Sequence, residues 1–293
     1  MKPGGMLSKL FLGPYFFTIA LREKHPLGIA DGKPFRAQMV LPATKDLWAA
    51  DPMLVDDGSK TWLFYEAVRG QKGRIEVAEV LDGCRLSEPV VLLEDTCHYS
   101  YPFVFQADGV WYMIPESSAA SEIRLYRAVS FPFQWELQTV LLHERAVDTT
   151  VFFHQSSYWL LTFLLDQGSE RVFPHAYTVE NWNTPVLREV SWQNYNPLQV
   201  RGAGAAFVTD NEILRPAQIS QPQRYGDGLV FYRPRLSDKY AEEPVFEITE
   251  KNLRIKGYFA DGLHTYSCSA RYEAIDVRCR TADPLKVAKR FMH

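Results

Sequence analysis

A pattern that repeats every 47 to 50 residues constrains the fold of this chain more than any other feature. Three segments each contain an apolar stretch, a polar turn and a second apolar stretch with a tryptophan; they are residues 50–66, 99–116 and 147–163. Asp51, Tyr101 and Asp148 open the copies, 50 and 47 residues apart. Self-similarity at this period indicates a fold in which similar small sheets are repeated around an axis.

The local sequence predicts short strands within each copy. Asp-Gly pairs separate the apolar stretches at 57–58, 82–83 and 108–109, and such pairs are typical of tight hairpins. We therefore predict an all-β, five-bladed β-propeller that forms a single domain over residues 1–293. The predicted blades are residues 48–95, 99–143, 146–193, 200–250, and 258–280 together with 15–24. In the last blade the N-terminal strand joins two C-terminal strands and closes the ring, which protects the sheet edges.

Composition and charge argue against several classes of protein. A hydrophobic content of 46% favours a large core, and a net charge of −3 gives no reason to expect a nucleic-acid partner. No Gly-rich loop follows a strand and opens a helix, so nucleotide-binding α/β folds are unsupported. The N-terminal apolar stretch is broken at Gly13-Pro14, and it is too short for a membrane span. We expect a cytoplasmic protein whose four cysteines are free thiols.

Acidic residues at the predicted strand starts are the first candidates for chemistry. The innermost strand of each propeller blade lines a central channel, so Asp51, Tyr101, Asp148 and Arg201 would meet at one mouth. A carboxylate with apolar neighbours in the sequence needs a partner or a ligand. The alternative is that each Asp only caps a turn before a strand.

Two glutamates end the second strand of their copies. Glu116 lies where neighbouring acids would raise its pKa and make it a general acid, or where an arginine would hold it in a structural ion pair. Both interpretations stay open for Glu116. For Glu66, at the matching place one copy earlier, we favour the structural ion pair.

Polar and aromatic residues near the predicted mouth are candidates for binding a substrate. His98 and His264 each precede a strand, where they would contact a hydroxylated ligand or hold a loop in place. Arginine suits a carboxylate, phosphate or sugar acid, or neutralises the channel acids. Aromatic rings stack on sugars, although most rings in such a chain belong to the core. The predicted substrate-binding set is Trp48, His98, Tyr99, Tyr101, Arg201, Arg215, Gln218, Tyr225 and His264.

No ligand spacing in the chain demands a metal, so we predict neither a metal site nor a cofactor. Ca²⁺ is the one ion that clustered carboxylates with a histidine would suit.

Several ordered motifs resemble one known family. They are ADPML, FYE, HYSYPFVFQADGVWYMIPES, LYRAVSFPFQW, VDTTVF, RPAQ with RYG, and GLHTYS with EAID. The series is similar to the propeller at the N-terminus of glucosamine inositolphosphorylceramide transferases and in stand-alone bacterial relatives. This resemblance implies a five-bladed propeller distantly similar to glycoside hydrolase family 43. Enzymes of family 43 use an Asp base, a second Asp and a Glu acid, which Asp51, Asp148 and Glu116 match by blade position.

We therefore expect a carbohydrate-active protein of surface-polysaccharide or glycoconjugate metabolism that acts on a glycosidic bond. Asp51 would be the base or nucleophile, Glu116 the acid, and Asp148 the group that orients them. Its partners would be a glycan or an activated sugar, and proteins of a polysaccharide pathway. The alternative is a non-catalytic glycan-binding or scaffold propeller, because fold does not dictate function.

Overall fold

The computed structural model describes residues 12–26, 28–44, 46–70, 72–166, 171–209, 212–221 and 224–282, and these residues form an all-β structure. Helical turns in the described residues are confined to four short 3₁₀ segments; these are η1 (Gly28–Asp31), η2 (Asp82–Cys84), η3 (Ser118–Ala120) and η4 (Glu250–Asn252). None of these segments has the length and apolar character that crossing a membrane requires. The prediction of an all-β fold is confirmed.

The three sequence copies form sheets in which successive strands pair antiparallel. The first contains β4 (Leu47–Asp56), β5 (Thr61–Arg69) and β6 (Lys72–Leu81), with β7 (Arg85–Leu86) and β8 (Val90–Leu93) both paired to β6. The second contains β9 (Ser100–Ala107), β10 (Val110–Glu116), β11 (Ile123–Ser130) and β12 (Gln134–Leu142). The third contains β13 (Ala146–His154), β14 (Ser157–Leu165), β15 (Val172–Val179) and β16 (Leu187–Trp192).

A fourth group of strands is joined to the third at its outer edge. It consists of β17 (Phe207–Thr209), β18 (Glu212–Gln221), β19 (Arg224–Leu236) and β20 (Lys239–Thr249). The edge strands β16 and β20 run parallel and pair Ser191 with Lys239 and Trp192 with Tyr240. The two groups therefore form one continuous eight-stranded sheet, a connection that the sequence repeat did not predict.

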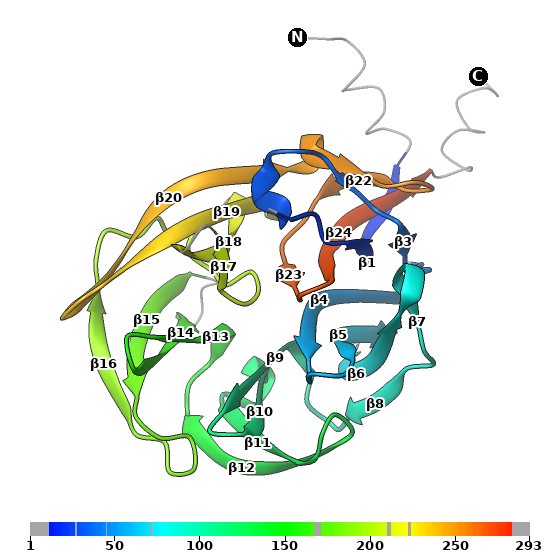
Figure 1. Cartoon of the computed structure of the whole chain (residues 1–293). Coiled ribbons are helices and arrows are strands. Elements are labelled where there is room, and N and C mark those ends of the chain that lie inside the picture. The colour runs from blue at the N-terminus through cyan, green and yellow to red at the C-terminus, as the bar shows by residue number, and fades with distance from the viewer. Residues whose placement is uncertain are drawn as a thin grey trace.

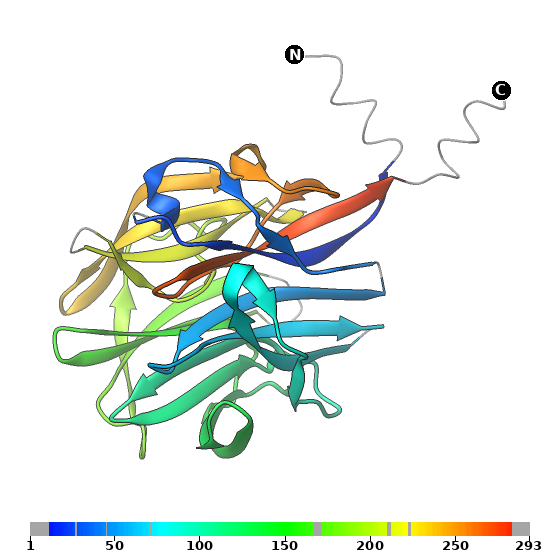
Figure 2. The ribbon, with the colours of Figure 1, turned by 45° about the vertical axis from the view of Figure 1, so that its right-hand side comes forward.

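The two ends of the described chain meet in the remaining large sheet. The predicted N-terminal strand is β1 (Leu12–Glu23), which pairs antiparallel with β24 (Tyr272–Ala282) along most of its length. We predicted two late strands, but three are present, because β22 (Phe259–Gly262) and β23 (Tyr266–Cys268) pair with β24 at separate places. Beside them, β3 (Met39–Val40) pairs with β1, and β2 (Phe35–Arg36) pairs with β21 (Leu253–Arg254). Figure 2 shows β1 and β24 side by side.

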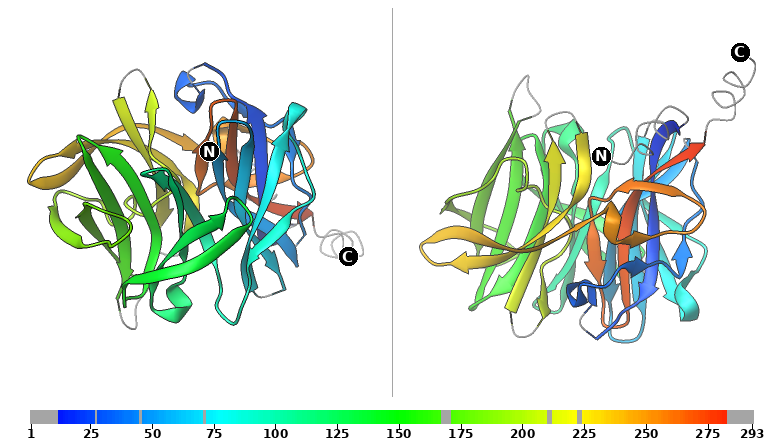
Figure 3. Two further views of the ribbon diagram at one scale, coloured as in Figure 1. Left: turned by 60° about the horizontal axis from the view of Figure 1, so that its bottom comes forward. Right: turned by 90° about the horizontal axis from the view of Figure 1, so that it is seen from above.

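The sheets are arranged around a common centre. Figure 1 shows β4, β9 and β13 near the middle of the molecule and β8, β12, β16 and β20 at its periphery. In the views of Figure 3 the sheets stand side by side around the molecule. Apolar residues pack between neighbouring sheets: Phe64 of β5 belongs to the same buried cluster as Phe103 of β9 and Leu160 of β14. Burial of such surfaces, at about 25 cal/mol per Å² of apolar area, is what holds the repeated sheets together.

The same backbone kink occurs near the start of three inner strands. Asp51, Tyr101 and Asp148 have φ values of 52°, 41° and 52°, in the left-handed region that non-glycine residues rarely adopt. At each kink the pairing with the next strand shifts register, as at a β-bulge. Strain of this kind persists only where surrounding contacts fix the backbone, and it is concentrated at functional sites.

Candidate active site

The backbone amides of the three kinked residues all donate to carboxylates. The amide of Asp51 donates to Oδ2 of Asp276 at 3.2 Å, and the amide of Tyr101 donates to Oδ2 of Asp51 at 3.2 Å. The amide of Asp148 lies 3.4 Å from Oε2 of Glu116. In each case the acceptor belongs to the preceding sheet around the centre. The kinks therefore gather acids from several sheets into one cluster, which contains the three predicted catalytic residues.

A buried histidine lies between two of these acids. Nδ1 of His264 is 2.7 Å from Oδ2 of Asp276, and Nε2 is 3.2 Å from Oδ1 of Asp51. Burial opposes charging of the ring, but the two carboxylates raise the pKa of His264 to about 10. Burial alone would raise the pKa of Asp51, yet the charge of His264 and hydrogen bonds from His264, Thr265 and the Tyr101 amide hold it below its ordinary value. Asp51 is therefore an ionised carboxylate beside an imidazolium.

Asp148 is held by a cation and an amide. Its Oδ2 accepts from Nε of Arg201 at 2.7 Å and from Nε2 of Gln218 at 3.2 Å. Burial raises the pKa of Asp148 in spite of Arg201, and the charge of Asp51 adds to the effect. Asp148 is thus fixed in place between Arg201, Gln218 and the other acids, as an orienting group must be.

Glu66 also belongs to the cluster, although we had interpreted it as structural. Its Oε1 lies 3.0 Å from Nε2 of His98, and no arginine is paired with it among the described residues. The amide of Gly73 donates to Nδ1 of His98, so the neutral ring carries its proton on Nε2, facing Glu66. Burial raises the pKa of Glu66 to about 7, and the charge of Asp51 contributes in spite of His98. Glu66 therefore retains a proton close to neutral pH.

Glu116 is the second carboxyl with a raised pKa. It is partly buried, and Oγ of Ser118 donates to its Oε1 at 3.1 Å. Burial and then the charge of Asp148 raise its pKa to about 8, which exceeds the lowering effect of Arg201. An arginine ion pair was the alternative for Glu116, but Arg201 is hydrogen-bonded to Asp148 instead. The electrostatic surroundings are those of a proton donor.

These raised pKa values predict how stability depends on pH. Glu116 keeps its proton in the folded protein at pH values where the unfolded chain loses it, so its contribution to the free energy of unfolding falls as pH rises from about 4.5 to about 8. We expect Glu116→Gln to gain stability relative to wild type, on the order of 1–3 kcal/mol, between pH 5 and pH 8.5. Urea denaturation at both pH values measures the difference. The exposed Glu88→Gln is the control, and a relative stability of Glu116→Gln that does not change with pH would contradict the prediction.

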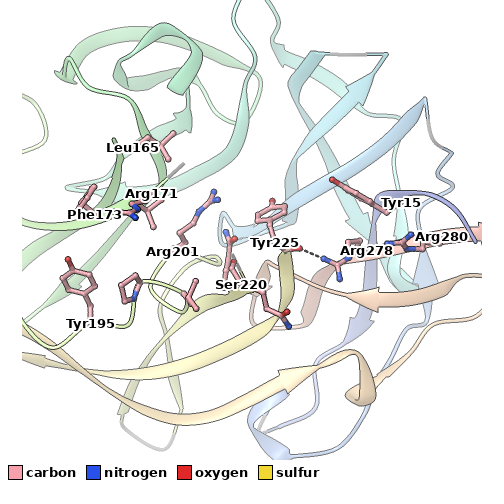
Figure 4. Close-up of a pocket in the computed structure, with 15 residues that line it drawn as sticks. Tyr15, Leu165, Arg171, Phe173, Tyr195, Arg201, Ser220, Tyr225, Arg278 and Arg280 are labelled. Carbon is pink, nitrogen blue, oxygen red and sulfur yellow. Dashed lines mark hydrogen bonds between the residues drawn. The ribbon is translucent and has the colours of Figure 1, made fainter. Parts of the chain in front are cut away.

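Two adjoining cavities open beside the acid cluster. The smaller, of about 200 Å³, is lined by Tyr15, Phe16, Phe17, Trp48, Ala50, Glu66, Tyr225 and His264. The larger, of about 1020 Å³, shares Tyr15 and Tyr225 with it and extends past Arg201 and Gln218 (Figure 4). The ring of Tyr225 stands 4.7 Å from that of His264, and the guanidinium of Arg201 lies over it at 5.4 Å. Glu66, whose pKa is raised to about 7, thus borders an aromatic cavity suited to a sugar ring.

Three predicted binding residues lie elsewhere or are fully engaged. Arg215 has no exposed surface, its guanidinium pairs with Glu242 between β18 and β20, and it is not among the described residues that line either cavity. Tyr99 is buried, and its hydroxyl bonds to Asp95, Tyr126 and Arg124. The ring of Tyr101 is buried too, with its hydroxyl on Thr150 and the amide of Gly204. Tyr101 reaches the cluster through its backbone amide alone.

Asp276 and Thr265 were not predicted as members of the cluster from the sequence, and Glu66 was predicted to be structural. Asp276 accepts hydrogen bonds from the amides of His264 and Thr265, both at 2.9 Å, and so anchors the loop that carries the histidine. One signal for Glu66 was present: it follows Asp51 by fifteen residues, as Glu116 follows Tyr101. Asp276 has no such signal, because it comes from the middle of a long strand outside the repeat.

Asp51, His264 and Asp276 could in principle hold a metal, because one ligand atom from each lies within 4.8 Å of the others. Nδ1 and Nε2 of His264 face carboxylate oxygens of Asp276 and Asp51, and these two carboxylates raise the pKa of the ring to about 10. A metal ion at this place would displace the proton from one of the ring nitrogens. The Ca²⁺ site that we considered stays a prediction.

Solved structures with a similar fold include enzymes whose names refer to sugars. β-1,2-Mannobiose phosphorylase from Listeria innocua matches 94% of this chain and 99% of its own, with 11% identity and a TM-score of 0.56. The α-L-arabinofuranosidase of Podospora anserina, in complex with cellotriose, matches 91% and 98%, with 9% identity and a TM-score of 0.56. The α-L-arabinanase of Cellvibrio cellulosa matches 76% and 87%, with 11% identity and a TM-score of 0.53. At these identities the likeness shows the fold alone, a β-propeller-like one.

Curated relatives are more similar in sequence. Glucosamine inositolphosphorylceramide transferase 1 of Arabidopsis thaliana is 31% identical over 178 residues, which cover 58% of this chain and 23% of the relative. The protein of the same name from Oryza sativa subsp. japonica is 32% identical over 212 residues, which cover 68% and 28%. The chain thus spans about a quarter of the length of these relatives. A family model described as "Glucosamine inositolphosphorylceramide transferase 1, N-terminal" matches residues 37–277, so the chain belongs to that family.

Proposed function

We propose that this protein acts on a glycosidic bond of a glycan or an activated sugar, with the acid cluster as its catalytic centre. The observation that carries the proposal is the opposite displacement of neighbouring pKa values. Asp51 is held ionised, while burial keeps protons on Glu66 and Glu116 near neutral pH. Cleavage or transfer at a glycosidic bond needs this combination, because one carboxyl protonates the leaving group while another acts as base or nucleophile.

Geometry supports a division of roles among the acids. In the proposal Asp51 is the base or nucleophile, and His264 keeps it charged. Glu66 is the first candidate for the proton donor, because it lines the smaller cavity with Trp48. Glu116, the donor expected from the sequence, is the second candidate, and Asp148 orients the cluster.

The comparisons support the carbohydrate class of the ligand. The relatives are named as transferases of glucosamine, and the solved neighbours are named as enzymes of mannobiose, arabinofuranoside and arabinan. We propose that the protein takes part in surface-polysaccharide or glycoconjugate metabolism, with polysaccharide-pathway proteins as its partners. A cytoplasmic location is part of the same proposal and rests on the sequence expectation alone.

We also infer that the sheets are five blades of one propeller. The support is the kink shared by three inner strands, the fourth group of strands after them, and the pairing of β1 with β24. In this interpretation the parallel contact between β16 and β20 joins the edges of two blades.

One observation favours a second function, a glycan-binding module without catalysis. Asp51 and Asp148 are each engaged by a cation, His264 and Arg201 respectively. Acids whose charge is neutralised in this way can serve to stabilise the centre of the molecule.

A screen of binding followed by turnover separates the two functions. The protein is applied to a glycan array and then incubated with aryl glycosides and nucleotide sugars, with products measured by mass spectrometry. We expect binding to at least one glycan, and turnover that Glu66→Gln lowers by about 10²-fold or more, since general acid catalysis contributes this much. Glycan binding without any turnover would favour the module. Binding of no glycan at all would contradict both functions.

A further inference from the structure

Among the residues that the structure describes, those with a charge that line the larger cavity beside the acid cluster are all arginines. We propose that this cavity binds the anionic group of a sugar ligand, a carboxylate or a phosphate attached to the sugar. This inference rests on the proposed carbohydrate ligand and adds its charge. The observations that carry it are the charged side chains of the cavity wall and one buried acceptor that has no partner.

Every charged residue among the described residues that line this cavity is an arginine; the four are Arg171, Arg201, Arg278 and Arg280. The chain as a whole has more acidic than basic residues, 35 against 32, so this wall differs from the average surface. The acids that pair with three of them, Asp148, Asp227 and Asp261, do not line the cavity. A ligand in the cavity therefore meets guanidinium groups, and low-dielectric walls strengthen their field.

The arginines approach the cavity from two sides. Arg171 directly precedes β15 and Arg201 precedes β17, whereas Arg278 and Arg280 belong to β24 on the opposite side (Figure 4). The hydrogen bonds of Arg201 and Arg280 to the described residues use Nε, with Asp148 and Asp261 as acceptors. The terminal nitrogens of these two guanidinium groups, Nη1 and Nη2, are the donors that recognise a carboxylate or phosphate.

Gln218 indicates that the ligand also carries hydroxyl groups. Its side chain is 99% buried at the cavity wall, since only 1% is exposed. Nε2 donates to Oδ2 of Asp148 and to the carbonyl of Gly202, and these two acceptors fix the orientation of the amide. Oε1 then has no hydrogen-bond partner in the described structure. A buried acceptor without a partner costs about 1–3 kcal/mol. Oε1 is almost completely buried, so a sugar hydroxyl in the cavity removes that cost once the amide turns toward it.

Calorimetric titration with small probes tests the inference on the wild-type protein. The probes are glucose, glucuronate, glucose 1-phosphate and inorganic phosphate, each at low and at high NaCl concentration. We expect one or both anionic sugars to bind at least about tenfold more tightly than glucose, with an advantage that high salt removes. Preference for glucuronate identifies a carboxylate site, and preference for glucose 1-phosphate identifies a phosphate site. Equal affinity for glucose and both anionic sugars overturns the inference. Inorganic phosphate that binds as tightly as glucose 1-phosphate overturns the requirement for a sugar.

Matched arginine variants assign the effect to the cavity. Arg171→Gln and Arg280→Gln are expected to reduce the preference for the anionic sugar by about tenfold when combined. Arg188→Gln, at an exposed arginine paired with Glu180 outside the cavity, is expected to leave the preference unchanged. A preference that survives the combined change places the anion elsewhere and overturns the inference.

The outcomes for this inference and for the proposed function are separable. Asp51→Asn is expected to retain anion binding even when turnover is lost, because Asp51 does not line the larger cavity. Turnover of neutral glycosides without any preference for anions would overturn the anion site and leave the catalytic proposal intact. Anion-dependent sugar binding without turnover would overturn the catalytic proposal and leave the anion site intact.

Discussion

Replacement of Asp51 by asparagine is expected to lower kcat on any glycoside that the protein turns over by about 10²–10⁴-fold, with a much smaller change in KM. The substitution keeps the size of the side chain and its acceptor for Thr265, but it removes the charge that the imidazolium of His264 stabilises. Steady-state kinetics on the substrate found by screening measure the loss. Because the pKa of Asp51 lies below its ordinary value, we also expect the wild-type rate to persist well into the acidic range.

Asp82→Asn is the control for this change. Asp82 is exposed and pairs with the exposed Arg271, and none of its described hydrogen bonds or ion pairs involves a residue of the acid cluster, so its charge has no part in the proposed chemistry. A kcat of Asp51→Asn within a factor of two of wild type would remove Asp51 from the mechanism. Rescue by Asp51→Glu, even partial, would show that a carboxylate is required at this position.

The second large effect is expected on stability, at Glu242. Glu242→Gln should lower the free energy of unfolding by about 3–5 kcal/mol, because it leaves the guanidinium of Arg215 charged and fully buried. That guanidinium lies among the rings of Phe163, Trp192 and Tyr232, and its Nη2 donates to Oε2 of Glu242 at 2.6 Å. Denaturation by guanidinium chloride measures the loss.

The adjacent residue provides a matched control for Glu242. Glu243 pairs with Arg235, and both side chains are more than half exposed, so Glu243→Gln should cost less than about 1 kcal/mol. Replacement of both buried partners, Arg215→Met with Glu242→Leu, should recover much of the stability that the single change loses. Equal effects at Glu242 and Glu243 would show that burial does not govern the strength of these pairs.

The sequence was sufficient to predict many of the strands and the proximity of three acids to one another. The fifty-residue period and the Asp-Gly turns correctly predicted β4 to β6 and β9 to β11, because hairpin chemistry is local. Asp51 and Asp148, at equivalent places in their copies, do share one cluster, and Glu116 from the end of a second strand joins them. Equivalent positions in a repeat take equivalent places around the centre, so their proximity did not depend on any contact seen in the sequence.

Other parts of the site depend on contacts that leave no local signal. The left-handed backbone at Asp51, Tyr101 and Asp148 is disfavoured by the residues themselves, and carboxylates from neighbouring sheets accept hydrogen bonds from all three amides. The kink turns the amide of Tyr101 toward Asp51 and leaves its ring in the core, whereas its place at the start of an inner strand predicted a ring at the mouth. The buried pair of Arg215 with Glu242 was not predicted, because a single strand does not reveal which of its faces will meet a buried Glu.

The pairing of Glu23 with Tyr272 has a consequence for synthesis on the ribosome. In a nascent chain the edge of β1 that pairs with β24 stays exposed until residues 272–282 have been translated, and long-range pairing of this kind is slow. The imidazole and carboxylate that balance Asp51 arrive with the same late segment, at residues 264 and 276. An incompletely translated chain therefore cannot assemble the acid cluster, and any activity that depends on Asp51 reports that translation has reached β24.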